Sequence, residues 1–133
     1  MKALFADAYY FVALGNPDDA DHQSVLAFAQ GLAAPILTTT WVLTEVGDAF
    51  AAPRQRAAFL RLLEELRNDS NATVVPASQA LFERGVELYS KRPDKAWSLT
   101  DCISFTVMND YQIIEALTGD HHFEQAGFRA LLK

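Results

Sequence analysis

The stretch SLTDCISFTVMNDYQIIEALTGD, residues 98–120, decides the fold that the sequence predicts. Its first part, residues 98–110, is apolar nearly all round, which is typical of a helix buried in the middle of a domain. Its second part, residues 112–117, is a short apolar run that predicts a buried strand. A polar turn, TGDHH, follows that strand. Helices that lead into buried strands are the repeating units of α/β proteins.

Strands and helices alternate in the same way outside this stretch. Short apolar runs that predict strands lie at residues 3–7, 35–40, 72–76, 112–117 and 128–132. Helical patterns lie between them, and the clearest amphipathic stripe consists of Phe59, Leu62, Leu63 and Leu66. Strands that alternate with helices predict the α/β class, with a central, mostly parallel sheet of four or five strands.

Length and composition indicate one globular domain, residues 1–133, with a sizeable core. Half of the residues are hydrophobic, but no apolar run approaches the roughly 20 residues that span a bilayer. The N-terminus has one Lys, a short apolar run and then an acid, so it does not predict a signal peptide. The single cysteine, Cys102, excludes an internal disulfide and fits a reducing compartment. The sequence therefore predicts a cytoplasmic protein.

The formal net charge of −6 bears on the possible partners. An acidic chain argues against nucleic-acid binding, since phosphate contacts come from Lys and Arg side chains. This inference fails if the acids form a metal site, because bound cations reverse the local field. The candidates for phosphate contacts would then be Arg54, Arg56, Arg92 and Lys95.

Four acids lie just after predicted strands or near the start of predicted helices. Asp7 ends the first strand, and Glu45 lies in the first turns of the helix after the second strand. Asp101 opens the helix that leads into the fourth strand, and Asp120 follows that strand. The carboxyl ends of parallel strands and the amino ends of their helices share one edge of the sheet, where ligands bind. We therefore expect these four side chains at one edge and Asp110, which ends its helix, at the opposite edge.

Each of the four acids also has a structural interpretation. Asp7 could cap a helix, Asp120 could shape a turn, and SLTD could form a capping box around Asp101. Glu45 is the hardest to explain in this way, because it lies among residues that are expected to pack and a buried carboxylate without a partner is costly. Taken together, four carboxylates at one edge repel one another unless cations hold them.

Carboxylates without accompanying thiols select the hard cations Mg²⁺ and Mn²⁺. Such an ion activates water and neutralises charge on a phosphoryl group, which is the chemistry of phosphodiester hydrolysis. His121 and His122 could be metal ligands, but adjacent side chains in an extended turn point apart, which argues against a joint role. We expect His122 to pack or to orient Asp120, and Cys102 to be a buried core thiol.

Four segments in order resemble the PIN domain, in particular the VapC-type toxin ribonucleases. These segments are LFADAYYFVAL, TTTWVLTEVGDAF, WSLTDCISFTVM and IIEALTGDHHFEQAGFRALL. The resemblance implies a compact three-layer α/β/α fold and a Mg²⁺- or Mn²⁺-dependent endoribonuclease. It also implies a homodimer and a small antitoxin that blocks the cleft, as in a type II toxin–antitoxin pair. The acids that it implies for catalysis and metal binding are Asp7, Glu45, Asp101 and Asp120.

We expect Asp7, Asp101 and Asp120 to bind the metal directly. Glu45 would bind the metal or orient a water on it. The chain departs from the family in two places, with Ala8 and Tyr9 where relatives often have Thr or Ser after the first acid, and with His122 where many carry a further Asp. Two alternatives remain, a housekeeping RNA-processing PIN nuclease and a non-catalytic PIN-like binding module. The complete acid set favours catalysis.

Overall fold

Five parallel strands form one sheet in the computed structural model, which describes residues 2–133. They are β1 (Leu4–Ala6), β2 (Ile36–Thr39), β3 (Ala72–Val75), β4 (Glu115–Leu117) and β5 (Arg129–Ala130). The strand order is β3-β2-β1-β4-β5, and Phe5 of β1 is paired with Leu37 of β2 on one side and Ala116 of β4 on the other. The predicted parallel sheet is therefore confirmed.

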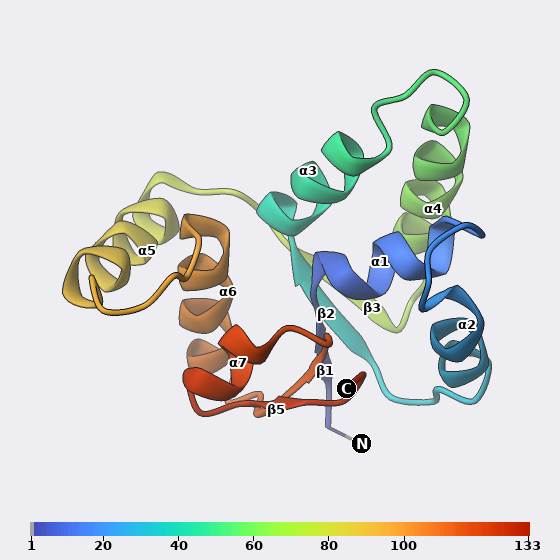
Figure 1. The fold of residues 1–133 in the computed structure, drawn as a ribbon. Helices are drawn as coiled ribbons and strands as arrows, with labels where there is room; N and C mark the ends of the chain where they lie inside the picture. Colours follow the sequence, from blue (N-terminus) through green and yellow to red (C-terminus); the bar gives the residue numbers. More distant parts are fainter. Residues whose placement is uncertain (1) are drawn as a thin grey trace.

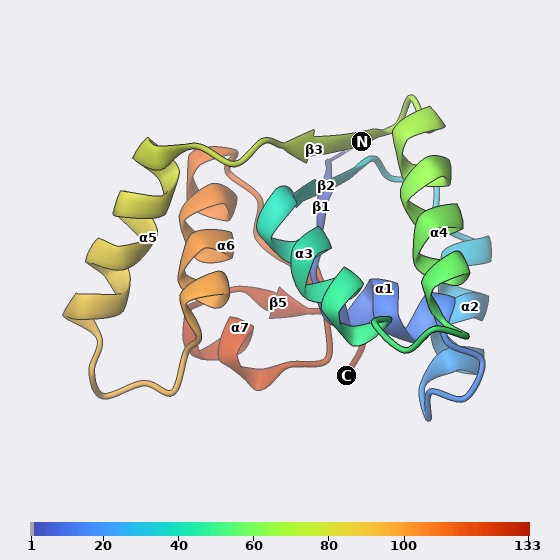
Figure 2. The same cartoon turned by 90° about the horizontal axis from the view of Figure 1, so that it is seen from above.

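Helices cover both faces of this sheet (Figures 1 and 2). Within residues 2–133 they are α1 (Ala8–Gly15), α2 (His22–Gln30), α3 (Thr40–Ala49), α4 (Arg56–Asn68), α5 (Gln79–Lys91), α6 (Leu99–Asp110) and α7 (His121–Gln125). Helices α5 and α6 lie on one side of the strands, and α1, α2 and α4 lie on the other. Helix α3 contacts α1, α4 and α6. The expected three-layer α/β/α arrangement is confirmed.

Helix α6 is the most deeply buried helix, as its sequence predicts. Every residue from Cys102 to Met108 is buried. The ring of Phe105 lies 5.0 Å from the ring of Phe123 in α7 and 5.1 Å from that of Trp97, both edge to face. These aromatic contacts hold the middle of α6 against α7, and both helices begin at the same edge of the sheet.

Two local features differ from the prediction. The chain after Asp120 is not an extended turn, because the Asp120 side chain accepts the N–H of His122 at 2.9 Å and starts the short helix α7. Strand β4 begins at Glu115 rather than at residue 112. The reason is the end of α6, where Gln112 has a φ of 56° and Ile113 donates its N–H back to the carbonyl of Met108 at 2.9 Å.

The helices of residues 2–133 are all too short or too polar to cross a lipid bilayer.

Candidate metal centre

The order of the strands places the ends of β1 and β4 next to each other. The chain runs from β1 outward to β3 and then returns to the other side of β1 to form β4 and β5. Ligand sites of open α/β sheets form at this kind of switch point, beyond the carboxyl ends of the strands. Asp7 follows β1 directly, and its N–H donates to the carbonyl of Leu117 at the end of β4, at 3.4 Å.

Asp7 is the most deeply buried of the four acids, with 7% of its surface exposed. It stands at the N-cap position of α1, but its side chain makes no capping hydrogen bond. Instead, its Oδ2 accepts the hydroxyl of Thr118 at 2.9 Å. Burial and, to a smaller extent, the charges of Asp101 and Glu45 raise the pKa of Asp7 to about 7, although hydrogen bonds from Thr118 and Ala8 lower it. The capping interpretation therefore does not account for this carboxylate.

Asp101 forms the capping box that SLTD suggested. Ser98 Oγ accepts the Asp101 N–H at 3.0 Å, and Asp101 Oδ2 accepts the Ser98 N–H at 3.2 Å. The same Oδ2 lies 3.1 Å from Nδ1 of His122. Burial raises the pKa of Asp101, hydrogen bonds from Ser98 and His122 lower it, and Asp120 raises it. Asp101 thus caps its helix while its carboxylate also faces the other acids.

Thr118 connects two of the acids and was missed by the sequence reasoning. It is fully buried. Its hydroxyl donates to Asp7 and accepts the N–H of Asp120 at 3.1 Å. The only sequence signal was its position, a hydroxyl residue between the fourth strand and an acid. Asp120 in turn caps α7, so the turn that carries it is held at both ends.

Glu45 lies at the expected edge but is exposed rather than packed, which corrects the sequence-based expectation. The buried face of α3 is formed by Val42, Leu43 and Val46, and Glu45 projects from a different side of the helix. Partial burial of its carboxyl group still raises its pKa, and the charges of Asp101, Asp120 and Asp48 raise it further. Glu45 therefore lies within the electrostatic reach of Asp101 and Asp120.

The four acids are not neutralised by an arginine or a lysine in the part of the chain that the structure describes. In the described chain, residues 2–133, no Lys or Arg forms an ion pair with any of them. Asp110, by contrast, lies at the other end of α6, as predicted. It forms an ion pair with Arg84 at 2.6 Å. A cluster of carboxylate oxygens without cationic side chains is chemically suited to a hard divalent cation.

The two histidines also belong to this cluster, which contradicts the expectation that their side chains point apart. Their rings are 4.5 Å apart, because His121 and His122 begin a helix instead of continuing an extended turn. Nδ1 of His122 lies 3.5 Å from Oδ1 of Asp120, and Nδ1 of His121 lies 3.6 Å from the same oxygen. Asp120, His121 and His122 offer ligand atoms that all lie within 4.8 Å of one another.

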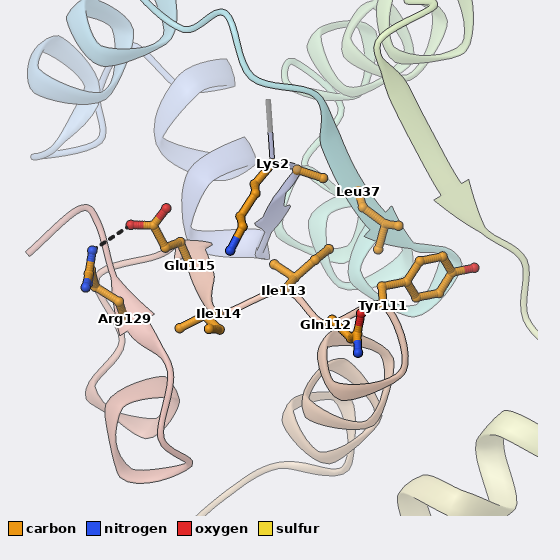
Figure 3. Close-up of a pocket in the computed structure, with 9 residues that line it drawn as sticks. Lys2, Leu37, Tyr111, Gln112, Ile113, Ile114, Glu115 and Arg129 are labelled. Atoms are coloured by element: carbon orange, nitrogen blue, oxygen red, sulfur yellow. Dashed lines mark hydrogen bonds and ion pairs between the residues drawn. The ribbon is translucent and has the colours of Figure 1, made fainter.

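One cavity of the described chain lies away from the acids. A pocket of about 460 Å³ opens at the opposite edge of the sheet, and Figure 3 shows Lys2, Tyr111 and Ile114 in its lining. Its carboxylate, Glu115, is paired with Arg129 at 2.9 Å. This pocket therefore offers no free acid for a metal ion.

Comparisons with known proteins support the fold. No protein-family model matches the sequence, and no curated protein matches it. The solved structure of VapC20 from Mycobacterium tuberculosis, a toxin that cleaves the sarcin–ricin loop, superposes with a TM-score of 0.85 at 25% sequence identity. That similarity covers 94% of this chain and 95% of VapC20. FitAcB from Neisseria gonorrhoeae superposes with a TM-score of 0.68 at 14% identity, over 96% of this chain and 95% of that chain.

Proposed function

We propose that this chain, which has the PIN-domain fold of VapC-type toxins, is a metal-dependent endoribonuclease and the toxin of a toxin–antitoxin pair. One observation carries the proposal. Four carboxylates from separate parts of the chain gather, with no Lys or Arg paired to them among the described residues, at the switch point of a fold shared with an RNA-cleaving toxin. A binding module would have no need to keep this repulsive cluster complete.

In this proposal Asp7, Asp101 and Asp120 hold a divalent cation, Mg²⁺ or Mn²⁺, and Glu45 binds it or orients a water. When bound, the cation supplies the activation of water and the charge neutralisation that phosphodiester hydrolysis needs. The protein contributes a rigid set of ligands. Thr118 orients Asp7, and the capping hydrogen bonds of Asp101 and Asp120 keep both carboxylates at the amino ends of their helices.

The loop between α5 and α6 is the proposed contact for the RNA backbone. Arg92 and Lys95 line a cavity of about 520 Å³ that also reaches Trp97 and Cys102, next to Asp101 in the sequence. The Arg92 guanidinium lies 5.0 Å above the Trp97 ring and pairs with Asp94 at 3.0 Å, which leaves Lys95 as the phosphate contact that we favour. Arg56, in contrast, donates to the carbonyl of Ala51, beyond the far end of α3.

The proposed partner is a small antitoxin, and we propose a homodimeric, cytoplasmic toxin. A groove of about 480 Å³ runs between α4 and α3. Helix α3 also carries Glu45. Its lining includes the apolar side chains of Leu43, Phe59 and Leu63. An amphipathic segment of the antitoxin would fit such a groove, and an Arg from it would neutralise the nearby carboxylates through its bidentate fork.

Cleavage of a mixed RNA pool tests the nuclease. The purified protein should cleave RNA with Mg²⁺ or Mn²⁺ and not with EDTA. Asp7→Asn should lower the rate at least about a hundredfold, as expected when a charged group that stabilises the transition state is lost. Asp110→Asn is the matched control, since Asp110 lies at the other end of α6, and it should keep wild-type activity. Equal losses in both variants would contradict the assignment of the site.

Growth of a bacterial host separates the toxin from a housekeeping nuclease. Expression of the wild-type chain alone should slow growth, and Asp7→Asn should relieve the effect. A small protein should co-purify with the chain when both are expressed from their native context. Harmless expression of a catalytically active chain would favour the housekeeping alternative, and folded protein that cleaves no RNA would favour the binding module.

A further inference from the structure

The imidazole of His122 occupies the space between two of the acids. Its Nδ1 lies 3.1 Å from Oδ2 of Asp101 and 3.5 Å from Oδ1 of Asp120. Its side chain is 20% exposed, whereas that of His121 is 67% exposed. The Nδ1 of His121 approaches Asp120 Oδ1 from the solvent side, at 3.6 Å. Asp120, His121 and His122 thus offer ligand atoms within 4.8 Å of one another at the start of α7, and Asp101 adjoins this group through His122.

The separations between the imidazole nitrogens and the carboxylate oxygens are compatible with binding to a shared ion. Two ligand atoms that are each about 2.1 Å from a metal are about 3.0 Å apart at a right angle and about 3.4 Å apart at a tetrahedral angle. The observed separations between the nitrogens and the carboxylate oxygens, 3.1, 3.5 and 3.6 Å, lie close to this range. The backbone is already held in place, because Asp120 Oδ1 accepts the N–H of His122.

We propose that His122, assisted by His121, supplies imidazole nitrogen to the divalent-metal site at Asp101 and Asp120, so that this protein prefers Mn²⁺ and later transition-metal ions to Mg²⁺. The inference rests on the metal site of the proposed function and adds to it two ligands and a metal preference. Mg²⁺ binds almost entirely through oxygen atoms, whereas imidazole is a good ligand for transition metals. Nitrogen ligands in an otherwise carboxylate site therefore shift its selectivity.

The competing role for His122 is that of a hydrogen-bond donor that only orients Asp101. His122→Asn separates the two roles, because the amide of Asn places a donor near the position of Nδ1 but is a poor transition-metal ligand. His121→Ala removes the solvent-exposed imidazole without affecting the core. His22→Asn is the control, since Nδ1 of His22 contacts the carbonyl of Ala13 at 2.7 Å, away from the acids.

Isothermal titration of the full chain with Mn²⁺ alone and with Mg²⁺ alone provides the test. The double variant His121→Ala/His122→Asn should bind Mn²⁺ at least about tenfold more weakly than wild type, while its affinity for Mg²⁺ should change less than about threefold. His22→Asn should match wild type for both ions. Titration with Co²⁺ should give a visible absorption band in wild type that shifts in the double variant, which reports a change of ligand independently of RNA cleavage.

The outcomes distinguish this inference from the proposed function. If the double variant binds both ions as wild type does, while Asp101→Asn loses both, the histidines are not ligands but the carboxylate site stands. Equal loss of Mn²⁺ and Mg²⁺ affinity in the double variant would also overturn the inference, because the histidines would then only orient the acids. If folded wild-type protein binds neither ion, both the inference and the metal-dependent nuclease are wrong.

Discussion

The hydroxyl of Thr118 donates a 2.9 Å hydrogen bond to the carboxylate of Asp7, from a position 111 residues away in the sequence. Thr118 follows β4 and Asp7 follows β1, and the two strands are neighbours in the sheet. The same hydroxyl accepts the N–H of Asp120 at 3.1 Å. One buried side chain therefore fixes the relative positions of two acids of the candidate metal centre.

Thr118→Val should damage both stability and cleavage. Valine has nearly the shape of threonine but leaves the Asp7 carboxylate and the Asp120 N–H without this partner. We expect the free energy of unfolding to fall by about 1–3 kcal/mol, the usual cost of an unsatisfied buried polar group. Metal affinity should also fall, because Asp7 loses its orientation. Urea unfolding and titration with Mn²⁺ measure the two effects.

Thr106→Val is the matched control for that variant. Thr106 is buried in α6, and its hydroxyl donates at 2.8 Å to the carbonyl of Cys102 in the same helix. That carbonyl lies in the middle of the helix and retains a backbone partner, so the loss should be small and Mn²⁺ affinity unchanged. If Thr106→Val weakened Mn²⁺ binding as much as Thr118→Val, the effect would come from general loosening of the fold.

The metal-free protein should lose stability as the pH rises from about 4 to about 7. Burial raises the pKa of folded Asp7 to about 7, while its ordinary value is 3.8. Between these values the folded state binds more protons than the unfolded state, so the free energy of unfolding falls as the pH rises. The whole shift corresponds to roughly 1.4 kcal/mol per pKa unit, or on the order of 4 kcal/mol. Thermal melts in EDTA at several pH values measure this dependence.

Asp7→Asn isolates the contribution of Asp7 from those of Asp101 and Glu45, whose pKa values are also raised by burial. The variant should melt at a higher temperature than wild type at pH 8 and at a similar temperature at pH 4. Parallel melting curves across the whole pH range would show that Asp7 is not protonated in the folded state.

Gly85→Ala should destabilise the contact between α5 and α6. A methyl group at position 85 would collide with Cγ1 of Ile103 and lie 3.4 Å from the Ile103 backbone. Overpacking of this kind should lower the free energy of unfolding by about 1–3 kcal/mol. Urea unfolding measures this loss. Gly31→Ala is the control, because the nearest atom to its methyl group is the carbonyl oxygen of Phe28 at 3.9 Å. A neutral Gly85→Ala would mean that the two helices move apart easily.

Gln112→Gly should stabilise the protein. Gln112 follows the C-cap of α6 in the left-handed region, with a φ of 56°, and its side chain is exposed. Glycine avoids the steric cost of that conformation, about 1–2 kcal/mol, but adds entropy to the unfolded chain. We expect a net gain of up to about 1 kcal/mol in the free energy of unfolding. Gln112→Val should be less stable than wild type, and the opposite order of the two variants would contradict this account.

The sequence by itself determined the class of the fold and the edge of the sheet at which each acid lies. Apolar runs that alternate with helical patterns imply a parallel sheet, and in such a sheet strand ends and helix starts share an edge. Asp7, Asp101 and Asp120 could therefore be placed together, and Asp110 apart from them, without any knowledge of contacts. The placement of these acids depends only on the direction of each helix and strand, which periodicity and apolar runs reveal.

Only the tertiary structure decided which side chains touch. The exposure of Glu45 depends on which face of α3 meets the sheet, and the contact of Thr118 with Asp7 depends on the pairing of β1 with β4. The grouping of His121 with His122 follows from the helix that Asp120 caps, where a local reading of TGDHH suggested an extended turn. Local patterns report the conformation of a segment, whereas contacts between residues far apart arise from packing of the whole chain, which no single segment encodes.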